Sequence, residues 1–441
     1  MTAHWAEHVI WWHVYPLGFL GAEKSSTPGT THRLRGLESW LDHLVELGAN
    51  GLALGPVFAS TTHGYDTRDH FTVDPRLGTE EDLVALVEAC HERGVRVELD
   101  GVFNHVGREF PQFQDVLENG ARSPYASWFH LDFDRPGPDG FGYRSFEGHD
   151  ALVTLNHENP EVAEYVTRVM THWCDRGVDA WRLDAAYAVP PAFWANVLPK
   201  TRLQHPELWV CGEMIHGDYA AYVDASGIDS VTQYELWKAV WSSLNDRNLF
   251  ELAHALERHA ALLPAFLPQT FVGNHDVTRI ASQLSDDRHV ALALAVLCAV
   301  PGVPSVYYGD ELGWRGVKEH RVGGDDAIRP PYPAAPRELD PAEKPVYDMH
   351  RELLAVRRRH AWVNDASIRE PDLLTNEVLA FRLESAENVI ALVLNVGDSR
   401  AEVELPVAGG EVLAGSGTAE PSGAGTTTRV AADHHGFVIV G

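Results

Sequence analysis

The feature that most constrains the fold is a regular alternation of short apolar runs with amphipathic helical stretches along most of the 441-residue chain. Such alternation is typical of a parallel sheet covered by helices. Helical patterns are found at Leu37–Leu47, Glu80–Arg93 and Pro160–Arg176. Eight apolar runs fit strands: Ile10–Tyr15, Gly51–Leu54, Val95–Asp100, Ala180–Asp184, Trp209–Glu213, Ser230–Tyr234, Thr270–Gly273 and Ser305–Tyr308.

Eight strands in this arrangement predict an α/β fold, a (β/α)8 TIM barrel of residues 1–106 and 155–360. One connection is far longer than a usual loop, because a long stretch follows the third predicted strand before the helix at Pro160. Residues 107–154 in this connection are rich in Gly, Pro, Asp and aromatic side chains. We therefore expect an inserted subdomain after strand 3, over residues 107–154.

The sequence pattern changes after about Arg359. Glu377–Leu383 and Asn388–Asn395 alternate as strands and are followed by turns rich in Gly, Ser and Thr. Residues 361–441 are therefore predicted to form a C-terminal antiparallel β domain, a β-sandwich. Within it, Gly415–Thr428 has the composition of a linker, and we expect a flexible loop there.

The charge balance excludes some partners. The chain has 35 basic and 63 acidic residues and a formal net charge of −28. Such a surface repels the phosphates of nucleic acids and anionic lipids, whereas a small neutral sugar is not repelled. We expect no nucleic acid and no membrane partner.

Nothing at the N-terminus resembles a signal peptide, and no window is apolar for long enough to span a membrane. The four cysteines are scattered without zinc-type spacing: Cys90, Cys174, Cys211 and Cys298. Buried free thiols in a reducing compartment are the favoured interpretation, and two disulfides are the alternative. This pattern predicts a cytoplasmic protein.

Four polar segments end predicted strands: Asp100–His105, Trp181–Asp184, Gly212–Glu213 and Phe271–Asp276. In an eight-stranded barrel the active site lies at the carboxyl ends of the strands. Strands three, four, five and seven would therefore bring these segments to one mouth.

The carboxylates in these segments suit glycoside cleavage with retention of configuration. That reaction needs one carboxylate to attack the anomeric carbon and a second to protonate the leaving oxygen, roughly 5 Å apart. Asp184 and Glu213 end adjacent predicted strands, and Arg182 would keep Asp184 ionised. Asp276 would be a third carboxylate at the same mouth. A structural ion-pair network is the alternative, but three carboxylates in register argue against it.

Several stretches resemble the short sequence regions of the α-amylase family, glycoside hydrolase family 13. They occur in the order of that family along nearly the whole chain, and they are most similar to the cyclomaltodextrinase and neopullulanase group. The matching stretches are Gly64–Asp74, Asp100–Gly107, Gly212–His216, Gly273–Arg279 and Tyr307–Gly313.

The resemblance implies that Asp184 is the nucleophile, Glu213 the acid/base and Asp276 the stabiliser of the transition state. It also implies that Tyr65 stacks on the sugar at the cleaved bond and that His105, Arg182 and His275 contact the same sugar. The residues after the nucleophile and the acid, Ala185–Tyr187 and Met214–Ile215, would line the acceptor side. Among the tryptophans, we expect Trp314, after strand eight, to bind sugar.

We expect no metal and no cofactor. In many relatives oxygen ligands hold calcium, but Leu17–Pro28 offers only Glu23 as a carboxylate, and we favour a hydrogen-bonding role for Asn104 over a calcium-binding one. The group usually carries an N-terminal β domain that its dimer uses. Because the first strand here begins near Ile10, a homodimer of this chain would not use such a domain.

The predicted function is hydrolysis of α-1,4 and/or α-1,6 bonds in short or cyclic malto-oligosaccharides. Relatives that trim single glucose units commonly have an aspartate three residues before the stacking tyrosine, where this chain has Thr62, which favours internal cuts. A cyclic maltosyl-maltose hydrolase is a more specific alternative. A transglycosylase or glucosyl isomerase on the same scaffold remains open, and a non-catalytic barrel protein ranks last because all three carboxylates are present.

Overall fold

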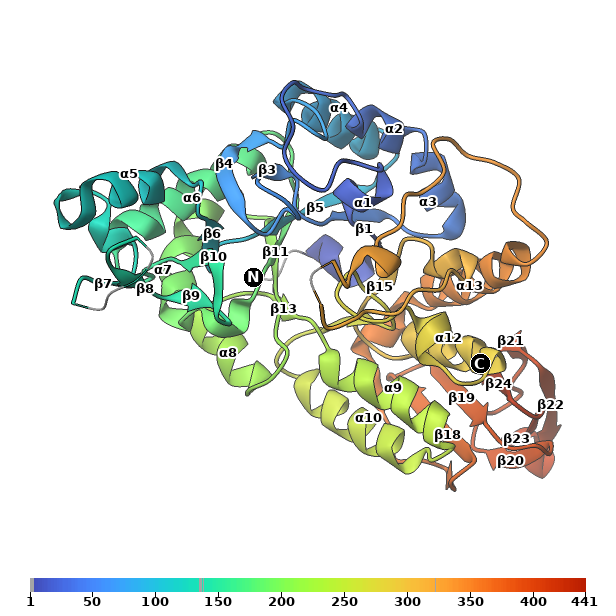
Figure 1. The fold of residues 1–441 in the computed structure, drawn as a ribbon. Coiled ribbons are helices and arrows are strands. Elements are labelled where there is room, and N and C mark those ends of the chain that lie inside the picture. Colours follow the sequence, from blue (N-terminus) through green and yellow to red (C-terminus); the bar gives the residue numbers. More distant parts are fainter. Residues whose placement is uncertain (1–3, 135–136, 138, 322) are drawn as a thin grey trace.

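The predicted barrel is confirmed. The computed structural model describes residues 4–134, 137, 139–321 and 323–441, and eight parallel strands form one sheet in it (Figure 1). An isolated parallel bridge between Thr232 and Gln269 joins the two outer strands and closes the barrel. In spatial order the strands are β13 (Ser230–Val231), β12 (Trp209–Gly212), β11 (Ala180–Leu183), β5 (Arg96–Gly101), β2 (Gly51–Leu54), β1 (Trp11–Val14), β15 (Val303–Tyr307) and β14 (Gln269–Phe271).

The sixth strand in chain order differs most from its prediction. The expected strand Ser230–Tyr234 ends at Val231, and Tyr234 is instead the first residue of α9 (Tyr234–Asp246). The physical reason is local capping, because the Gln233 side chain accepts a hydrogen bond from Leu236 N (3.4 Å) and starts the helix.

Helices cover the outside of the barrel. The helix predicted at Leu37–Leu47 is divided in two, because the buried Trp40 between the halves donates its indole N–H to Pro333 O (3.1 Å). The Thr79 capping box begins α4. The α-helices are α1 (Pro16–Phe19), α2 (Leu34–Glu38), α3 (Leu41–Leu47), α4 (Glu80–His91), α6 (Pro160–Cys174), α7 (Pro191–Arg202), α8 (Tyr219–Ser226), α9, α10 (Phe250–Leu262), α11 (Ile280–Gln283), α12 (Val290–Ala299) and α13 (Glu343–Arg359).

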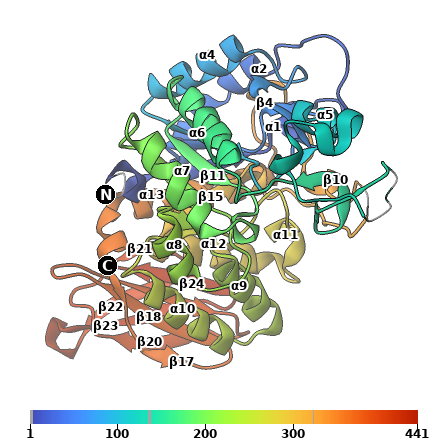
Figure 2. The same cartoon turned by 90° about the vertical axis from the view of Figure 1, so that its left-hand side faces the viewer.

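Between β5 and α6 the chain leaves the barrel, as the long connection indicated, and it protrudes at the end of the molecule opposite the C-terminal strands (Figures 1 and 2). The hairpin of β3 (Phe58–Ser60) and β4 (Thr67–Val73) lies beside its base. The excursion contains a three-stranded sheet in the order β6-β10-β9. Its elements are β6 (His105–Gly107), α5 (Pro111–Asn119), β7 (Leu131–Asp132), β8 (Gly142–Tyr143), β9 (Ser145–Phe146) and β10 (His149–Thr154).

The C-terminal strands are antiparallel, as predicted, and form two sheets. The expectation of a flexible loop at Gly415–Thr428 is wrong, since most of this stretch forms the β22–β23 hairpin. Its hydroxyl side chains are used within the sheet, because Ser422 and Thr427 donate to Glu404 Oε1. The strands are β16 (Ser367–Ile368), β17 (Leu373–Leu374), β18 (Val378–Glu384), β19 (Val389–Asn395), β20 (Ala401–Leu405), β21 (Val412–Gly415), β22 (Gly417–Ser422), β23 (Thr427–Ala432) and β24 (Gly436–Val440).

Tryptophans close the amino end of the barrel. Trp11 and Trp209 stack inside it with ring centroids 5.9 Å apart, and Trp5 packs edge-on against Trp11. The tryptophan rings fill the amino end of the barrel. The polar side chains of the interior lie farther along the strands, so the polar part of the barrel interior lies toward the carboxyl ends of its strands.

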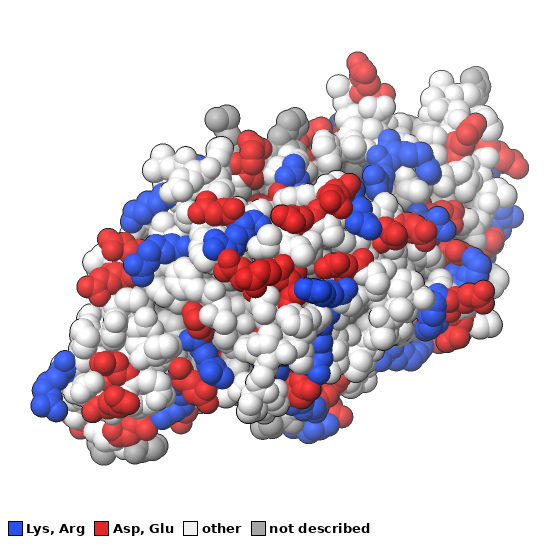
Figure 3. Space-filling view, turned by 90° about the horizontal axis from the view of Figure 1, so that it is seen from above, with Lys and Arg blue, Asp and Glu red and all other residues white. Residues whose placement is uncertain are grey.

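Two features of the described chain bear on its surroundings. All four cysteines are buried and free, so the structure has the free thiols that were favoured over two disulfides. No helix within the described residues is both long and apolar enough to cross a bilayer. On the face seen in Figure 3, acidic and basic side chains are interspersed, without the continuous basic track that a nucleic acid would require on that face.

Candidate active site

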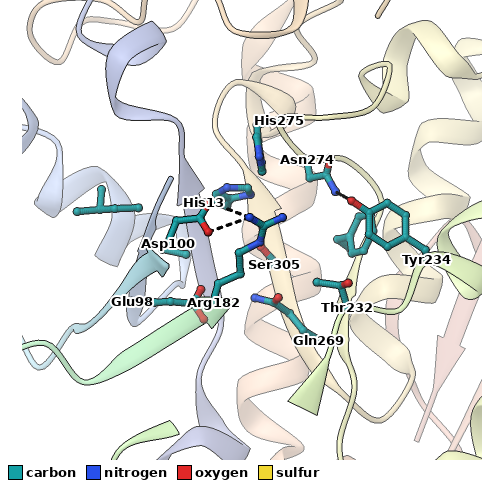
Figure 4. A pocket seen from close by; sticks show the side chains of 13 residues that line it. His13, Glu98, Asp100, Arg182, Thr232, Tyr234, Gln269, Asn274, His275 and Ser305 are labelled. Atoms are coloured by element: carbon teal, nitrogen blue, oxygen red, sulfur yellow. Dashed lines mark hydrogen bonds and ion pairs between the residues drawn. The ribbon is translucent and has the colours of Figure 1, made fainter. Parts of the chain in front are cut away.

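The site is built by side chains that alternate along the barrel strands. Residues two apart in a strand point to the same face, so Glu98 and Asp100 of β5 both face inward. Arg182 of β11 lies beside them, and these groups line a cavity of about 30 Å³ together with His13 and Gln269 (Figure 4). This polar layer is the floor on which the reactive carboxylates stand.

Arg182 is the centre of the arrangement. Its Nη1 lies 2.8 Å from both carboxylate oxygens of Asp100 and 3.1 Å from Asp184 Oδ1. Its Nη2 lies 2.7 Å from Glu213 Oε1. One guanidinium therefore binds both carboxylates that the sequence assigns to bond cleavage, which places them at the same point of the barrel mouth.

The backbone after the nucleophile candidate also holds Glu213. Ala185 has a left-handed φ of 46°, which a residue other than glycine rarely adopts. This turn directs Ala185 N to Glu213 Oε2 at 2.9 Å, while the Tyr234 hydroxyl donates to Glu213 Oε1 at 3.2 Å. Both oxygens of Glu213 are thus oriented by fixed donors, and the strained residue lies where the orientation is set.

Asp184 keeps one oxygen without a close donor among the described residues. Its Oδ1 is bound by Arg182, whereas its Oδ2 faces His105 Nε2 at 3.9 Å. Burial lowers the pKa of His105 to about 3, so the ring is neutral at pH 7. The ring stacks on Phe146 of β9, with centroids 4.7 Å apart, and its buried Nε2 is free to donate to a ligand.

The third carboxylate belongs to a second cluster at the same mouth. His275 Nε2 lies 2.9 Å from Asp276 Oδ2 and also contacts the Tyr65 hydroxyl, which donates to Asp100 Oδ2 at 3.0 Å. Arg329 Nη2 lies 2.7 Å from Asp276 Oδ1. Tyr65 thereby links the Asp276 cluster to the Arg182 cluster.

The electrostatics of the two clusters differ. Burial raises the pKa of Asp184, and the neighbouring carboxylates add to this rise while Arg182 opposes it. Partial burial also works against ionisation of Asp276, but His275 and Arg329 together hold the pKa of Asp276 well below its usual range. Asp276 is therefore ionised at neutral pH, whereas burial and the neighbouring carboxylates work against ionisation of Asp184.

A cleft of about 360 Å³ opens above these groups. The insertion after β5 forms one wall through Phe146 and Glu147, and the Tyr187 hydroxyl donates to Glu147 Oε1 at 3.0 Å. The cleft is lined by five of the predicted site residues, and Arg182 and His275 lie in the floor beneath them. These five are Tyr65, His105, Asp184, Glu213 and Asp276.

Trp314 does not belong with them. Its indole N–H donates to Glu343 Oε1 at 3.2 Å, and its ring packs against Tyr332 with centroids 5.1 Å apart. The sequence reasoning placed it after strand eight, which is correct, but the 3-10 helix Asp310–Leu312 turns the chain away from the cleft. Trp314 is therefore a packing residue.

Three functional candidates were missed from the sequence. Asp100 lies in a segment that was recognised, and the need of Arg182 for a buried counter-charge was the signal that could have found it. Tyr234 and Arg329 carry no motif. They reach the site only because α9 begins early and because the loop after β15 folds back over the mouth.

The loop expected to lack a calcium site, Leu17–Pro28, is bound by the buried guanidinium of Arg76. Arg76 donates to Glu23 O at 2.9 Å and to Asp74 on both carboxylate oxygens. The Glu23 carboxylate, the acidic side chain of this loop, is bound by Arg33. Asn104 Nδ2 lies 3.1 Å from His105 Nδ1 and orients that ring, in keeping with a hydrogen-bonding role.

Known proteins resemble this chain over its full length. A cyclomaltodextrinase from Geobacillus thermopakistaniensis is 30% identical over 463 residues, which cover 99% of this chain and 77% of that protein. The solved debranching enzyme of Nostoc punctiforme has a TM-score of 0.84 at 26% identity, covering 100% of this chain and 99% of its own. For the cyclic α-maltosyl-(1→6)-maltose hydrolase of Arthrobacter globiformis the TM-score is 0.81 at 25% identity, with the same two coverages.

The family model for the catalytic domain of α-amylase matches residues 13–367. This range contains every barrel strand from His13 onward and both carboxylate clusters of the cleft. The chain therefore belongs to the α-amylase family of glycoside hydrolases.

Proposed function

We propose that the chain hydrolyses α-glucosidic bonds of short or cyclic malto-oligosaccharides by double displacement, with Asp184 as nucleophile and Glu213 as acid/base. The observation that carries this proposal is the shared guanidinium: Arg182 binds Asp184 Oδ1 at 3.1 Å and Glu213 Oε1 at 2.7 Å. It leaves Asp184 Oδ2 facing the cleft without a close donor, as an attacking oxygen requires.

In the first step Asp184 Oδ2 bonds to the anomeric carbon while Glu213 gives its proton to the departing glycosidic oxygen. The glycosidic bond breaks and the sugar is held as an ester of Asp184. In the second step Glu213 takes a proton from water, the water oxygen bonds to the anomeric carbon, and Asp184 leaves as a carboxylate.

Asp276 supplies fixed negative charge opposite the developing positive charge on the sugar. Its low pKa keeps it ionised, and its two oxygens are positioned by His275 and Arg329. Tyr65 offers its ring to a sugar in the cleft, while the neutral His105 ring donates to one of its hydroxyls and His275 contacts the same sugar. Electrostatic stabilisation of this kind acts strongly because the site is set in a partly buried cleft.

The relatives' names and the cleft together support a short or cyclic α-glucan as substrate. A cyclic substrate has no chain end, so it needs a cleft without a carboxylate gripping terminal hydroxyls. Thr62, at the position where such a carboxylate would stand, turns its hydroxyl to Asp66 Oδ2 at 2.7 Å and does not line the cleft. Ala185, Tyr187 and Ile215 line the side assigned to the acceptor.

A product time course tests the substrate assignment. The purified enzyme is incubated with maltotetraose, a cyclodextrin, pullulan and a cyclic tetrasaccharide that has both α-1,4 and α-1,6 links. Maltose or panose as the first product supports internal cleavage, and glucose released alone from chain ends contradicts it. Longer saccharides formed at high sugar concentration would indicate a transglycosylase, and no turnover of any substrate would indicate a non-catalytic protein.

We also propose a cytoplasmic location, which the four buried free thiols support. We propose that neither nucleic acid nor membrane is a partner. The limits proposed for the units are residues 1–106 and 155–360 for the barrel, 107–154 for the insertion and 361–441 for the C-terminal unit.

A further inference from the structure

A second cluster of chemically active side chains lies far from the cleft in the fold. Among the described residues, Asp286, His289 and His435 bring one ligand atom each within 4.8 Å of one another. Asp286 and His289 precede α12 of the barrel layer, while His435 lies in the turn between β23 and β24. The cluster thus bridges a barrel helix and the C-terminal strands.

The geometry of the cluster is close to that of a metal site. His289 Nε2 lies 3.0 Å from His435 Nδ1, and Asp286 Oδ2 lies 3.9 Å from His435 Nδ1. Ligand bonds of about 2.0–2.1 Å in a tetrahedral site place ligand atoms roughly 3.3–3.4 Å apart. Shifts of about half an ångström would therefore fit an ion between these atoms. Both imidazoles are buried, and the side chain of Asp286, which is 28% exposed, provides the entry path.

A neighbouring carboxylate sets one imidazole in the form that metals bind. His435 Nε2 lies 2.8 Å from Asp398 Oδ1, and Asp398 is in turn bound by Arg247. A ring that donates its Nε2–H to a carboxylate has its lone pair on Nδ1, the nitrogen that faces His289 and Asp286. His435 also has a left-handed φ of 49°, a conformation that a histidine adopts at a cost and that fixes the ring here.

We propose that Asp286, His289 and His435 bind a divalent transition-metal ion, with zinc as the best match and water as the fourth ligand. Imidazole nitrogens suit zinc, copper and nickel, whereas calcium prefers an all-oxygen shell. The ion would fasten the start of α12 to the turn before β24. Its competitor is Arg288, whose Nε and Nη2 bond both oxygens of Asp286, at 2.9 and 2.6 Å.

Zinc titration with a chromogenic competitor tests the site in the full-length, untagged protein after removal of bound metal. The wild type is expected to bind one tight equivalent. His289→Gln and His435→Asn are expected to lower that affinity at least about 100-fold, and asparagine is chosen because it tolerates a left-handed φ. Asp398→Asn should lower it about 10–100-fold. His254→Gln, at an exposed histidine of α10, is the matched control and should change nothing.

Two further measurements separate a metal site from a plain hydrogen bond between two histidines. Arg288→Gln frees Asp286 and should tighten zinc binding, an effect that a purely structural cluster would not produce. Cobalt bound to the wild type should give the strong visible absorption of a tetrahedral site, and His289→Gln should remove it. Equal zinc affinity in the wild type and His289→Gln, or no equivalent bound by the wild type, would overturn the proposal.

Discussion

The buried pair of Arg76 and Asp74 offers a quantitative test of how the mouth of the barrel is held. Both side chains are 1% exposed. All five N–H donors of the Arg76 guanidinium are used, two of them on the Asp74 carboxylate. The other three reach Ser60 Oγ, Glu23 O and Thr62 O, at distances of 2.8, 2.9 and 2.6 Å. Arg76 therefore joins the loop that contains Glu23 to the β3–β4 loop that contains Tyr65.

Arg76→Met is expected to destabilise the protein by about 3–5 kcal/mol, because it leaves a carboxylate buried without its cation. The value should lie near the lower end, since Asp74 keeps hydrogen bonds from Ser60 N, Ser60 Oγ and Arg76 N. For a chain of this size roughly 1 °C of melting temperature corresponds to 1 kcal/mol, so the midpoint should fall by about 3–5 °C.

The assay is thermal unfolding followed by circular dichroism for the wild type, Arg76→Met, Asp74→Asn and the double variant. The double variant should be more stable than Arg76→Met, because it removes the unpaired charge. Arg93→Met, which breaks the exposed pair with Asp42, is the control and should shift the midpoint by no more than about 2 °C. The pair keeps its stabilising effect at neutral pH and loses it as the pH falls through the lowered pKa of Asp74. A shift in Arg76→Met no larger than in the control, or strict additivity in the double variant, would refute the reasoning.

Three further predictions concern the site and its surroundings. Arg329→Gln removes a cation from Asp276, so the pKa of that carboxyl should rise. The acid limb of the kcat/KM profile should then move to higher pH, and kcat/KM should fall about 10–100-fold. An unchanged acid limb would count against the assigned contact. Calcium added to chelator-treated enzyme should not raise activity, and restoration by calcium would contradict the assignment of Arg76 as the cation of that loop. Titration with a thiol reagent should find fewer than one reactive cysteine in the native protein and all four after unfolding, because all four are buried. Burial raises the pKa of three of these thiols to about 12, those of Cys90, Cys174 and Cys298.

The parts of the fold that the sequence predicts are those governed by local pattern. Strand alternation identifies the barrel, and each strand that contributes a candidate residue ends within about two residues of its expected limit, apart from Ser230–Val231. That strand is shorter because the Gln233 side chain caps the start of α9, so the helix begins before the apolar run ends. The hairpin at Gly417–Ala432 was missed because the Gly-, Ser- and Thr-rich composition of Gly415–Thr428 hides a pairing that tertiary contacts stabilise.

The residues of the site also fall into those that the sequence predicts and those that it does not. Asp184, Glu213 and Asp276 follow strands, so their convergence could be predicted from topology alone. Arg329 and Tyr234 could not, since a loop that returns from the far side and an early helix start place them. Trp314 shows the converse: its position in the chain suggested a sugar contact, but its indole is used by Glu343.

The central claim is that Asp184 forms a covalent bond to the sugar while Glu213 handles the proton. Its most direct test is mass spectrometry of Glu213→Gln after reaction with α-maltosyl fluoride. Fluoride leaves without protonation, so the first step should proceed, while the loss of the base should slow hydrolysis of the ester. The account predicts a maltosyl adduct on the peptide that contains Asp184, and none when Asp184→Asn is added. An adduct on another residue, or turnover with no adduct at any time, would contradict it.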